Sequence, residues 1–183
     1  MKGFGLTCRF LGFCALTLLM VSCVKDVDLG QGKEIQLTPD IQTDLLIYTV
    51  EKKDLIDSEN GEIKQAIRDT VRLEFLDDDY IQNDLFSAEL YFSNTNTFSQ
   101  AFTTRISFLS ESGAEQFSVN YDIPAGTEAS PSSAEALEVV EEDRIHLLRN
   151  SIKMVVELQM QSAPGNLEGQ LDFDSTGLFK FEF

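Results

Sequence analysis

Apolar and polar residues alternate along most of the chain after residue 33. In residues 86–93, for example, a Phe, Ala or Leu side chain occupies every second position. A period of two is typical of a strand with one face on a core and the other in water. This pattern and one mixed apolar run predict nine strands, at residues 33–38, 45–50, 71–75, 86–93, 104–108, 117–123, 154–160, 171–173 and 179–183. So many short strands predict an all-β fold.

Turn residues and one helical pattern separate these strands. Polar residues at 57–61 and 126–133 predict loops, and the Asp-Ser-Thr-Gly stretch at 174–177 predicts a hairpin turn. Apolar residues recur with a helical spacing within 134–149, most clearly at 141–149. The sequence therefore predicts an antiparallel β-sandwich, immunoglobulin-like or similar, with one short helix near 141–149.

The last predicted strand leaves a second fold open. Residues 178–183 form an alternating aromatic segment, which is also typical of outer-membrane barrels. A small β-barrel is therefore the alternative to the sandwich. Within a sandwich, we expect this strand either in the core or at an open edge, where a partner strand could be added.

The first 22 residues have the composition of a targeting segment. Lys2 and Arg9 supply positive charge, and residues 11–21 are almost entirely apolar. The uncharged stretch from Phe10 to Val24 is shorter than the roughly 20 residues that a membrane-spanning helix needs. These features predict a secretory signal at residues 1–22.

A short motif lies at the end of this signal. Met20-Val21-Ser22-Cys23 resembles a bacterial lipobox, in which the cysteine is acylated and becomes the first residue of the mature protein. The resemblance implies a bacterial lipoprotein whose lipid is carried by Cys23. It also implies a lipidated tether at 23–32 and a single β domain at 33–183, held at a membrane by acyl chains.

The residues after the cysteine carry a second resemblance. Lys25 followed by Asp26 and Asp28 is similar to the export signal of surface lipoproteins in Bacteroidota. The similarity implies an outer-membrane protein exposed at the cell surface. A plain solvated tether, with the domain on the periplasmic face, is the alternative.

The charge of the chain restricts its partners. Its 14 basic and 31 acidic residues give a net charge of −17, and removing the two basic residues of the signal leaves −19. A field of this sign repels phosphate backbones, so nucleic acid is excluded as a partner. The membrane, through the lipid, and a surface or outer-membrane protein remain the expected partners.

Residues for catalysis or metal binding are scarce in the sequence. All three cysteines, Cys8, Cys14 and Cys23, precede the predicted domain, and the single histidine, His146, has no partner motif. The acidic run 77–79 could collect a cation, and residues 172–177 resemble the start of an EF-hand loop. That loop would need an acid at its twelfth position, where Phe183 stands. We therefore expect no enzyme, no cofactor and no metal site.

Two tripeptides carry a further resemblance. Asp69-Thr70-Val71 and Asp174-Ser175-Thr176 look like the sites that Bacteroidota glycosylate on exported proteins. They imply possible O-glycosylation at Thr70 and Ser175.

The sequence leads to one functional expectation with two alternatives. It favours a membrane-anchored, non-catalytic lipoprotein that acts as a structural or protein-interaction module. The first alternative is a ligand-binding accessory lipoprotein, for example one that captures glycans. An enzyme that uses a pair of acids is the less favoured alternative.

Overall fold

A computed structural model describes residues 38–162 and 167–183. The predicted signal, the tether and almost all of the predicted strand at 33–38 lie outside the described residues. The described elements are, in chain order, β1 (Asp40–Glu51), β2 (Ala66–Arg72), the 3-10 helix η2 (Glu74–Asp77), α2 (Asp79–Asp84), β3 (Leu85–Asn96), β4 (Phe102–Leu109), β5 (Glu115–Ile123), β6 (Ser132–Val140), α3 (Ile145–Arg149), β7 (Lys153–Met160) and β8 (Gln170–Phe181).

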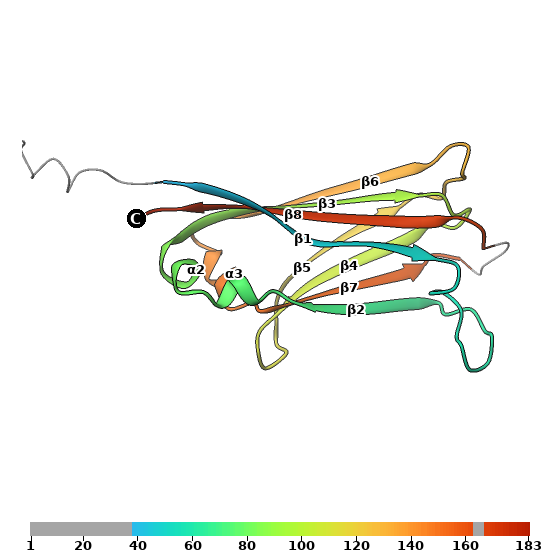
Figure 1. Cartoon of the computed structure of the whole chain (residues 1–183), viewed down its shortest axis with the longest axis horizontal. Helices are drawn as coiled ribbons and strands as arrows, with labels where there is room; N and C mark the ends of the chain where they lie inside the picture. The colour runs from blue at the N-terminus through green and yellow to red at the C-terminus, as the bar shows by residue number, and fades with distance from the viewer. Residues whose placement is uncertain (1–37, 163–166) are drawn as a thin grey trace, which may run out of the picture. The chain divides into compact units, whose positions relative to one another are not determined.

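The eight strands form two four-stranded antiparallel sheets packed as a sandwich (Figure 1). One sheet has the strand order β1-β8-β3-β6, and the other has the order β2-β7-β4-β5. Every connection except the β4–β5 hairpin passes from one sheet to the other. This arrangement is that of an eight-stranded jelly roll. The predicted all-β sandwich is confirmed.

The strand order narrows the prediction, which left the sandwich as immunoglobulin-like or similar, to a jelly roll. Immunoglobulin domains place several consecutive strands side by side in one sheet, whereas only β4 and β5 are such a pair here. Alternation reports which face of a strand is buried, but it does not report which strand lies beside it. The pairing of β1 with β8 joins residues 119 to 140 positions apart, and no local pattern predicts it.

Residues 170–181 form one strand, where the sequence predicted two strands and a hairpin turn at 174–177. Ser175 and Gly177 lie in the middle of β8, which is paired with β1 on one side and β3 on the other. A Cβ at Gly177 would lie 2.4 Å from the ring of Phe179, so the glycine makes room for that ring. Pairing on both sides outweighs the turn preference of these residues. The final strand is therefore central, and the expectation of an open edge there is wrong.

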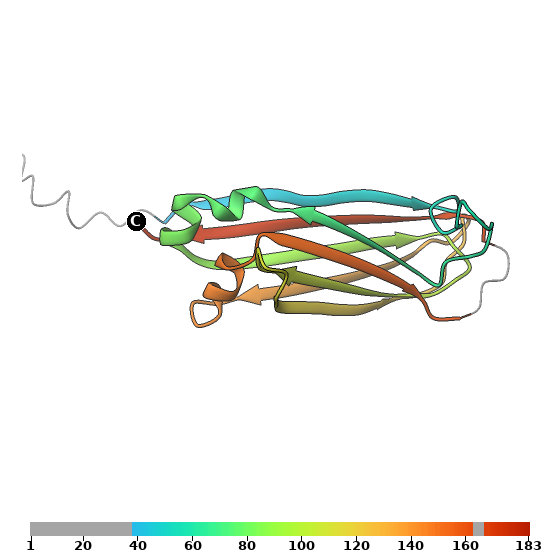
Figure 2. The ribbon, with the colours of Figure 1, turned by 90° about the horizontal axis from the view of Figure 1, so that it is seen from below.

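The short helix predicted near 141–149 is confirmed as α3, whereas the earlier part of the helical pattern, from residue 134, belongs to a strand. Residues 132–140 form β6, and only residues 145–149 of the segment are helical, as α3. Leu137 and Val139 point outward from β6, while two alanines and Val140 occupy inward positions. Because β6 carries apolar residues on both faces, its pattern imitates a helical spacing. Figure 2 shows α2 and α3 at the same end of the sandwich as the C-terminus.

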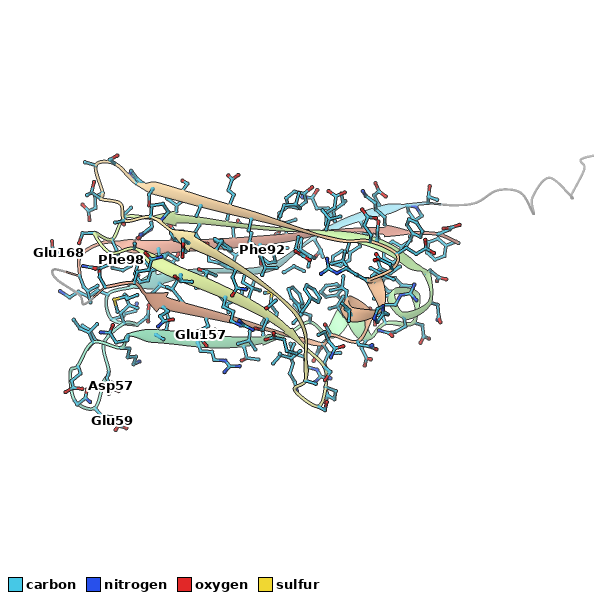
Figure 3. All side chains as sticks on the ribbon, turned by 180° about the vertical axis from the view of Figure 1, so that it is seen from behind. Asp57, Glu59, Phe92, Phe98, Glu157 and Glu168 are labelled. Carbon is cyan, nitrogen blue, oxygen red and sulfur yellow. The ribbon has the colours of Figure 1, made fainter. Side chains whose placement is uncertain are left out.

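The interior of the sandwich is aromatic, as the alternating phenylalanines predicted. Phe92 and Phe173 lie between the sheets (Figure 3 labels Phe92), and their ring centroids are 6.4 Å apart. The ring of Phe173 also stacks on Tyr48 at 5.0 Å. The largest fully buried side chains are Phe92, Phe98, Phe102, Phe108, Phe173, Phe179, Phe181, Leu55, Leu76, Ile81, Leu85 and Leu90. Their burial is the main favourable contribution to folding.

One hydrogen bond joins the two sheets through the interior. The hydroxyl of Tyr121 on β5 donates to Oδ1 of Asn94 on β3 at 2.5 Å. The Asn94 side chain in turn donates to the carbonyl of Asp172 at 3.3 Å. Burial raises the pKa of Tyr121 well above its ordinary value, so the hydroxyl stays protonated as a donor.

Replacing Tyr121 with phenylalanine is expected to lower the free energy of unfolding by about 1–3 kcal/mol. The substitution keeps the ring but leaves the buried Oδ1 of Asn94 without its donor. Urea denaturation followed by circular dichroism measures this loss. Tyr80→Phe is the matched control, because Tyr80 is 40% exposed and its hydroxyl bonds to the side chain of Asp78 and not to the opposite sheet, so its loss should change stability little. Equal effects of the two variants would show that the hydrogen bond between the sheets contributes nothing.

Candidate binding face

The outer faces of the two sheets differ in character. The described strands of the β2-β7-β4-β5 sheet expose no large apolar side chain, and several of their outward polar side chains are paired, as in the Arg105–Glu115 ion pair at 2.8 Å and the Thr103–Asp122 hydrogen bond at 2.9 Å. On the β1-β8-β3-β6 sheet, large apolar or aromatic side chains point into solvent. They include Ile47, Tyr91, Leu137 and Val139, with exposed fractions of 59%, 42%, 52% and 38%, and Phe86, at the bulge in β3, is also 40% exposed. We call the outer surface of this second sheet the binding face.

The strand register sets the side chains of this face in rows. Tyr91 on β3 lies opposite Leu137 on β6 and opposite Thr176 on β8. In the next row, Ser93 lies opposite Glu135 on one side and Asp174 on the other. Together these two rows line a groove of about 520 Å³, the Tyr91 groove, with the residues Tyr91, Phe92, Ser93, Glu135, Ala136, Leu137, Asp174 and Thr176. The register therefore brings three strands together at one hollow.

The ring of Tyr91 is held in place by its neighbours on the face. Its hydroxyl donates to the carboxylate of Glu89, two positions earlier on the same side of β3. Glu89 also accepts from Nζ of Lys180 on β8 at 2.5 Å. The hydrogen bonds from Lys180 and then Tyr91 hold the pKa of Glu89 below its ordinary value, so this anchor is ionised at neutral pH. The ring is thus fixed at the wall of the groove, with part of its surface in solvent.

The binding face is strongly acidic. Within the four described strands of this sheet, Lys180 is the single basic residue, and it is already paired with Glu89. The register and alternation place seven acids outward: Asp40, Asp44, Glu51, Glu89, Glu135, Asp172 and Asp174. Among the described residues, no cationic side chain pairs with Glu135 or Asp174 in the groove. The groove therefore presents negative charge next to an aromatic ring.

A smaller crevice of about 290 Å³ opens between β1 and β2, the edge strands of the two sheets. Aliphatic side chains form part of its lining, with Tyr48, Asp54, Arg68 and Asp69 among the polar residues. Burial, and next the charge of Asp69, raise the pKa of Tyr48 well above its ordinary value. Asp69 occupies an inward position of β2, where a charge discourages pairing with another strand. We therefore interpret this crevice as the protected open side of the sandwich.

The two predicted glycosylation sites differ in their accessibility. Thr70 is exposed on the edge strand β2, and its N–H donates to the carboxylate of Asp69 at 2.7 Å. Ser175 is buried in β8, where its Oγ donates to the carbonyl of Leu46 at 2.9 Å and accepts from the N–H of Leu46 at 3.0 Å. A sugar on Ser175 would have to separate β8 from β1. The folded domain therefore offers Thr70 as an acceptor and does not offer Ser175.

The other predicted site residues fall in two groups. Cys23, Lys25, Asp26 and Asp28 lie outside the described residues. His146 lies on α3, and the acidic run 77–79 joins η2 to α2. Across residues 38–162 and 167–183, no group of three or more His, Cys, Asp or Glu side chains is arranged to hold a metal ion. No helix in the same residues has the length and apolar character that a membrane crossing requires.

The sequence pattern alone does not predict the binding face. The alternation of residues 86–93 places Tyr91 on the polar side of its strand, and Leu137 falls in the segment 134–149, where the spacing of apolar residues is helical. One signal was present, because Tyr91 is the aromatic residue among the otherwise polar outward positions of residues 86–93. The sequence does not predict which residues of β6 and β8 lie beside Tyr91. These residues are more than 40 and more than 80 positions away along the chain, and only the strand pairing brings them together.

The fold and the face define a jelly-roll domain with one hollowed, acidic outer surface. No protein-family model matches the chain, and no curated protein matches it. Among solved structures, a presumed secreted protein of Parabacteroides distasonis matches with 15% identity and a TM-score of 0.43, over 62% of this chain and 37% of that one. The infectious bursal disease virus Gx strain matches with 9% identity and a TM-score of 0.42, over 79% of this chain and 32% of that one.

A third similarity is to the enzymatically active domain of tailspike protein 4 from bacteriophage CBA120. It has 15% identity and a TM-score of 0.39, over 78% of this chain and 19% of that one. The chain spans about a third of the length of the first two proteins and less of the third. At these identities and TM-scores, the similarities carry no argument about function or location.

Proposed function

We propose that the protein is a non-catalytic interaction module, anchored by lipid on Cys23 to the outer membrane and exposed at the cell surface. Its binding face holds a partner protein. The observation that carries the proposal is the contrast between the two outer surfaces of one sandwich. One surface exposes no large apolar side chain, whereas the other exposes Tyr91 and Leu137 at the groove, Val139 two positions from Leu137 on β6, and Ile47 across the sheet on β1. Exposed apolar side chains with a polar surround are typical of a protein-interaction site.

Partner capture tests the face directly. The tagged, lipidated protein is affinity-purified from gently solubilised native membranes. The proteins that co-purify with it, its companions, are identified and compared with those that co-purify with Leu137→Ser. Loss of the same stoichiometric companion from Leu137→Ser, with retention by Ile41→Ser, is the expected result. Ile41 is a matched control, because it is also about half exposed but occupies an inward position of β1 near the end of the sandwich. Equal capture by both variants would reject the binding face.

The anchor is tested by Cys23→Ala. This variant is expected to carry no fatty-acid label and to leave the membrane fraction, because the acyl chains supply the attachment. Labelling of cells with an alkyne-bearing fatty acid, followed by fractionation, measures both properties. Cys14→Ala is the control and should be labelled like the natural protein. Persistent label on Cys23→Ala would refute lipidation at this residue.

Surface export is tested separately from anchoring. Replacing Lys25 and Asp26 with alanine is expected to abolish protease accessibility on intact cells while the lipid label remains. Unchanged accessibility would contradict the export role of these residues and leave the periplasmic face as an open location.

A ligand-binding role, such as glycan capture, is the second candidate. The observation that favours it is the exposed ring of Tyr91 in a groove beside two hydroxyl side chains, Ser93 and Thr176. A sugar could place its apolar face on such a ring. Most phenylalanines lie in the core, however, so the domain does not present the row of exposed aromatics that a glycan-binding end would favour.

A further inference from the structure

We infer that the Tyr91 groove is a site for an arginine side chain of the partner protein. The guanidinium lies between Glu135 and Asp174, and its plane rests against the ring of Tyr91. This inference rests on the proposed function, because it names the chemistry by which the binding face recognises its partner.

The first argument is the arrangement of the two carboxylates. Glu135 and Asp174 stand on opposite sides of Ser93, on the strands that flank β3. Their backbones are separated by two strand spacings, about 9.6 Å. A guanidinium has hydrogen-bond donors on both edges, and so it can serve two acceptors that approach from opposite sides. The row formed by Glu135, Ser93 and Asp174 therefore fits a planar cation that has hydrogen-bond donors on both edges.

The second argument is charge complementarity. Neither groove carboxylate has a cationic partner among the described residues, and the nearest basic side chain on the face, Lys180, is already paired with Glu89. The carboxylates of Glu135 and Asp174 repel each other and the surrounding acids. A positive charge that enters the groove lowers this repulsion. A neutral sugar would leave this repulsion unchanged, and an anionic ligand would increase it. The charge distribution therefore selects a cation.

The third argument is the fixed aromatic wall. The bond from its hydroxyl to Glu89 restrains the ring of Tyr91 before any ligand arrives. A guanidinium stacks on an aromatic face and keeps its in-plane donors free, whereas an ammonium acts as a strongly hydrated point charge. The aliphatic part of an arginine side chain also has an apolar neighbour in Leu137, opposite Tyr91. These features favour arginine over lysine.

The test uses the full-length, lipidated protein in detergent and three synthetic peptides. The first is an acetylated, amidated Val-Arg-Val-Arg-Val peptide. In the second and third, lysine or citrulline replaces both arginines, and citrulline keeps the shape of arginine without its charge. Surface plasmon resonance is expected to show the order arginine, lysine, citrulline, with about tenfold weaker binding of the arginine peptide when salt rises from about 50 to about 500 mM.

Variants of the groove assign the binding to named residues. Glu135→Gln and Asp174→Asn are each expected to weaken binding of the arginine peptide by about tenfold. Tyr91→Ser is expected to weaken the same binding by about threefold or more. Glu157→Gln is the matched control, because Glu157 is an acid on β7 of the opposite sheet, as labelled in Figure 3. This control should bind the peptide like the natural protein.

Four outcomes overturn the inference. They are equal binding of the citrulline peptide, no binding of the arginine peptide, binding unaffected by Glu135→Gln and Asp174→Asn, and preferential binding of neutral cellohexaose that depends on Tyr91 but not on salt. Partner capture separates this result from the proposed function. If a companion is lost from Leu137→Ser but kept by Glu135→Gln and Asp174→Asn, the interaction role stands and the arginine site falls.

Discussion

Replacing Phe173 with alanine is expected to lower the free energy of unfolding by about 3–5 kcal/mol. Phe173 lies in the central strand β8, only 1% of its surface is exposed, and its ring contacts those of Tyr48 and Phe92. Alanine would leave a cavity between the two sheets, where strands paired on both sides of β8 have little freedom to collapse. Both the lost burial and the cavity contribute to the cost.

Urea denaturation followed by circular dichroism measures this effect. Phe183→Ala is the matched control, because it removes the same atoms from a side chain that is 55% exposed. A loss well below 1 kcal/mol is expected for the control. If the two variants lost the same stability, Phe173 would not be a core residue, and the packing of β8 between the sheets would be wrong.

Replacing Gly126 with alanine is expected to cost at least about 3 kcal/mol, because the new methyl group meets backbone and not a movable side chain. A Cβ at this position would lie 2.0 Å from the carbonyl oxygen of Asn96 and 2.8 Å from the nitrogen of Ser132. Asn96 ends β3 and Ser132 begins β6, so these two strands would have to separate where they pair. The N–H of Gly126 also donates to the carbonyl of Phe98 at 2.8 Å.

Gly113→Ala is the control for this second variant. Gly113 has φ +86°, and nothing lies within 4 Å of the position of its Cβ. Alanine there bears only the strain of the left-handed backbone, about 1 kcal/mol. Melting temperatures of the two variants, measured side by side, should fall much further for Gly126→Ala. A small effect of Gly126→Ala would mean that the β3–β6 junction is looser than the close contact indicates.

The β3–β6 junction matters for the proposed function because the Tyr91 groove is built across it. Leu137 and Glu135 belong to β6, and Tyr91 and Ser93 belong to β3. A slip of one residue between these strands would turn Leu137 and Glu135 to the other side of the sheet. The arginine site therefore depends on the same register that Gly126 protects.

Much of the candidate site could not be predicted from the sequence, for two physical reasons. The alternation of residues 86–93 correctly predicts that Tyr91 points outward, but the groove beside its ring also needs Leu137 and Thr176, which reach it only through pairing of distant strands. The spacing around Leu137 predicts a helix, because apolar residues on both faces of a strand resemble a helical repeat. The motifs at Cys23 and Lys25, in contrast, consist of consecutive residues, so the sequence alone can indicate them. They stay predictions because they lie outside the described residues.

The sequence by itself determined the all-β class, the aromatic core and the positions of most strands, because alternation is a local property of the chain. Residues 86–93, 104–108, 117–123 and 154–160 were predicted as strands and lie within β3, β4, β5 and β7. Only the tertiary structure decided the jelly-roll order, the continuity of β8 through Ser175 and Gly177, and the hollow on one outer face. These features arise from contacts between segments far apart in the chain, where pairing and packing energies outweigh the local preferences of the residues.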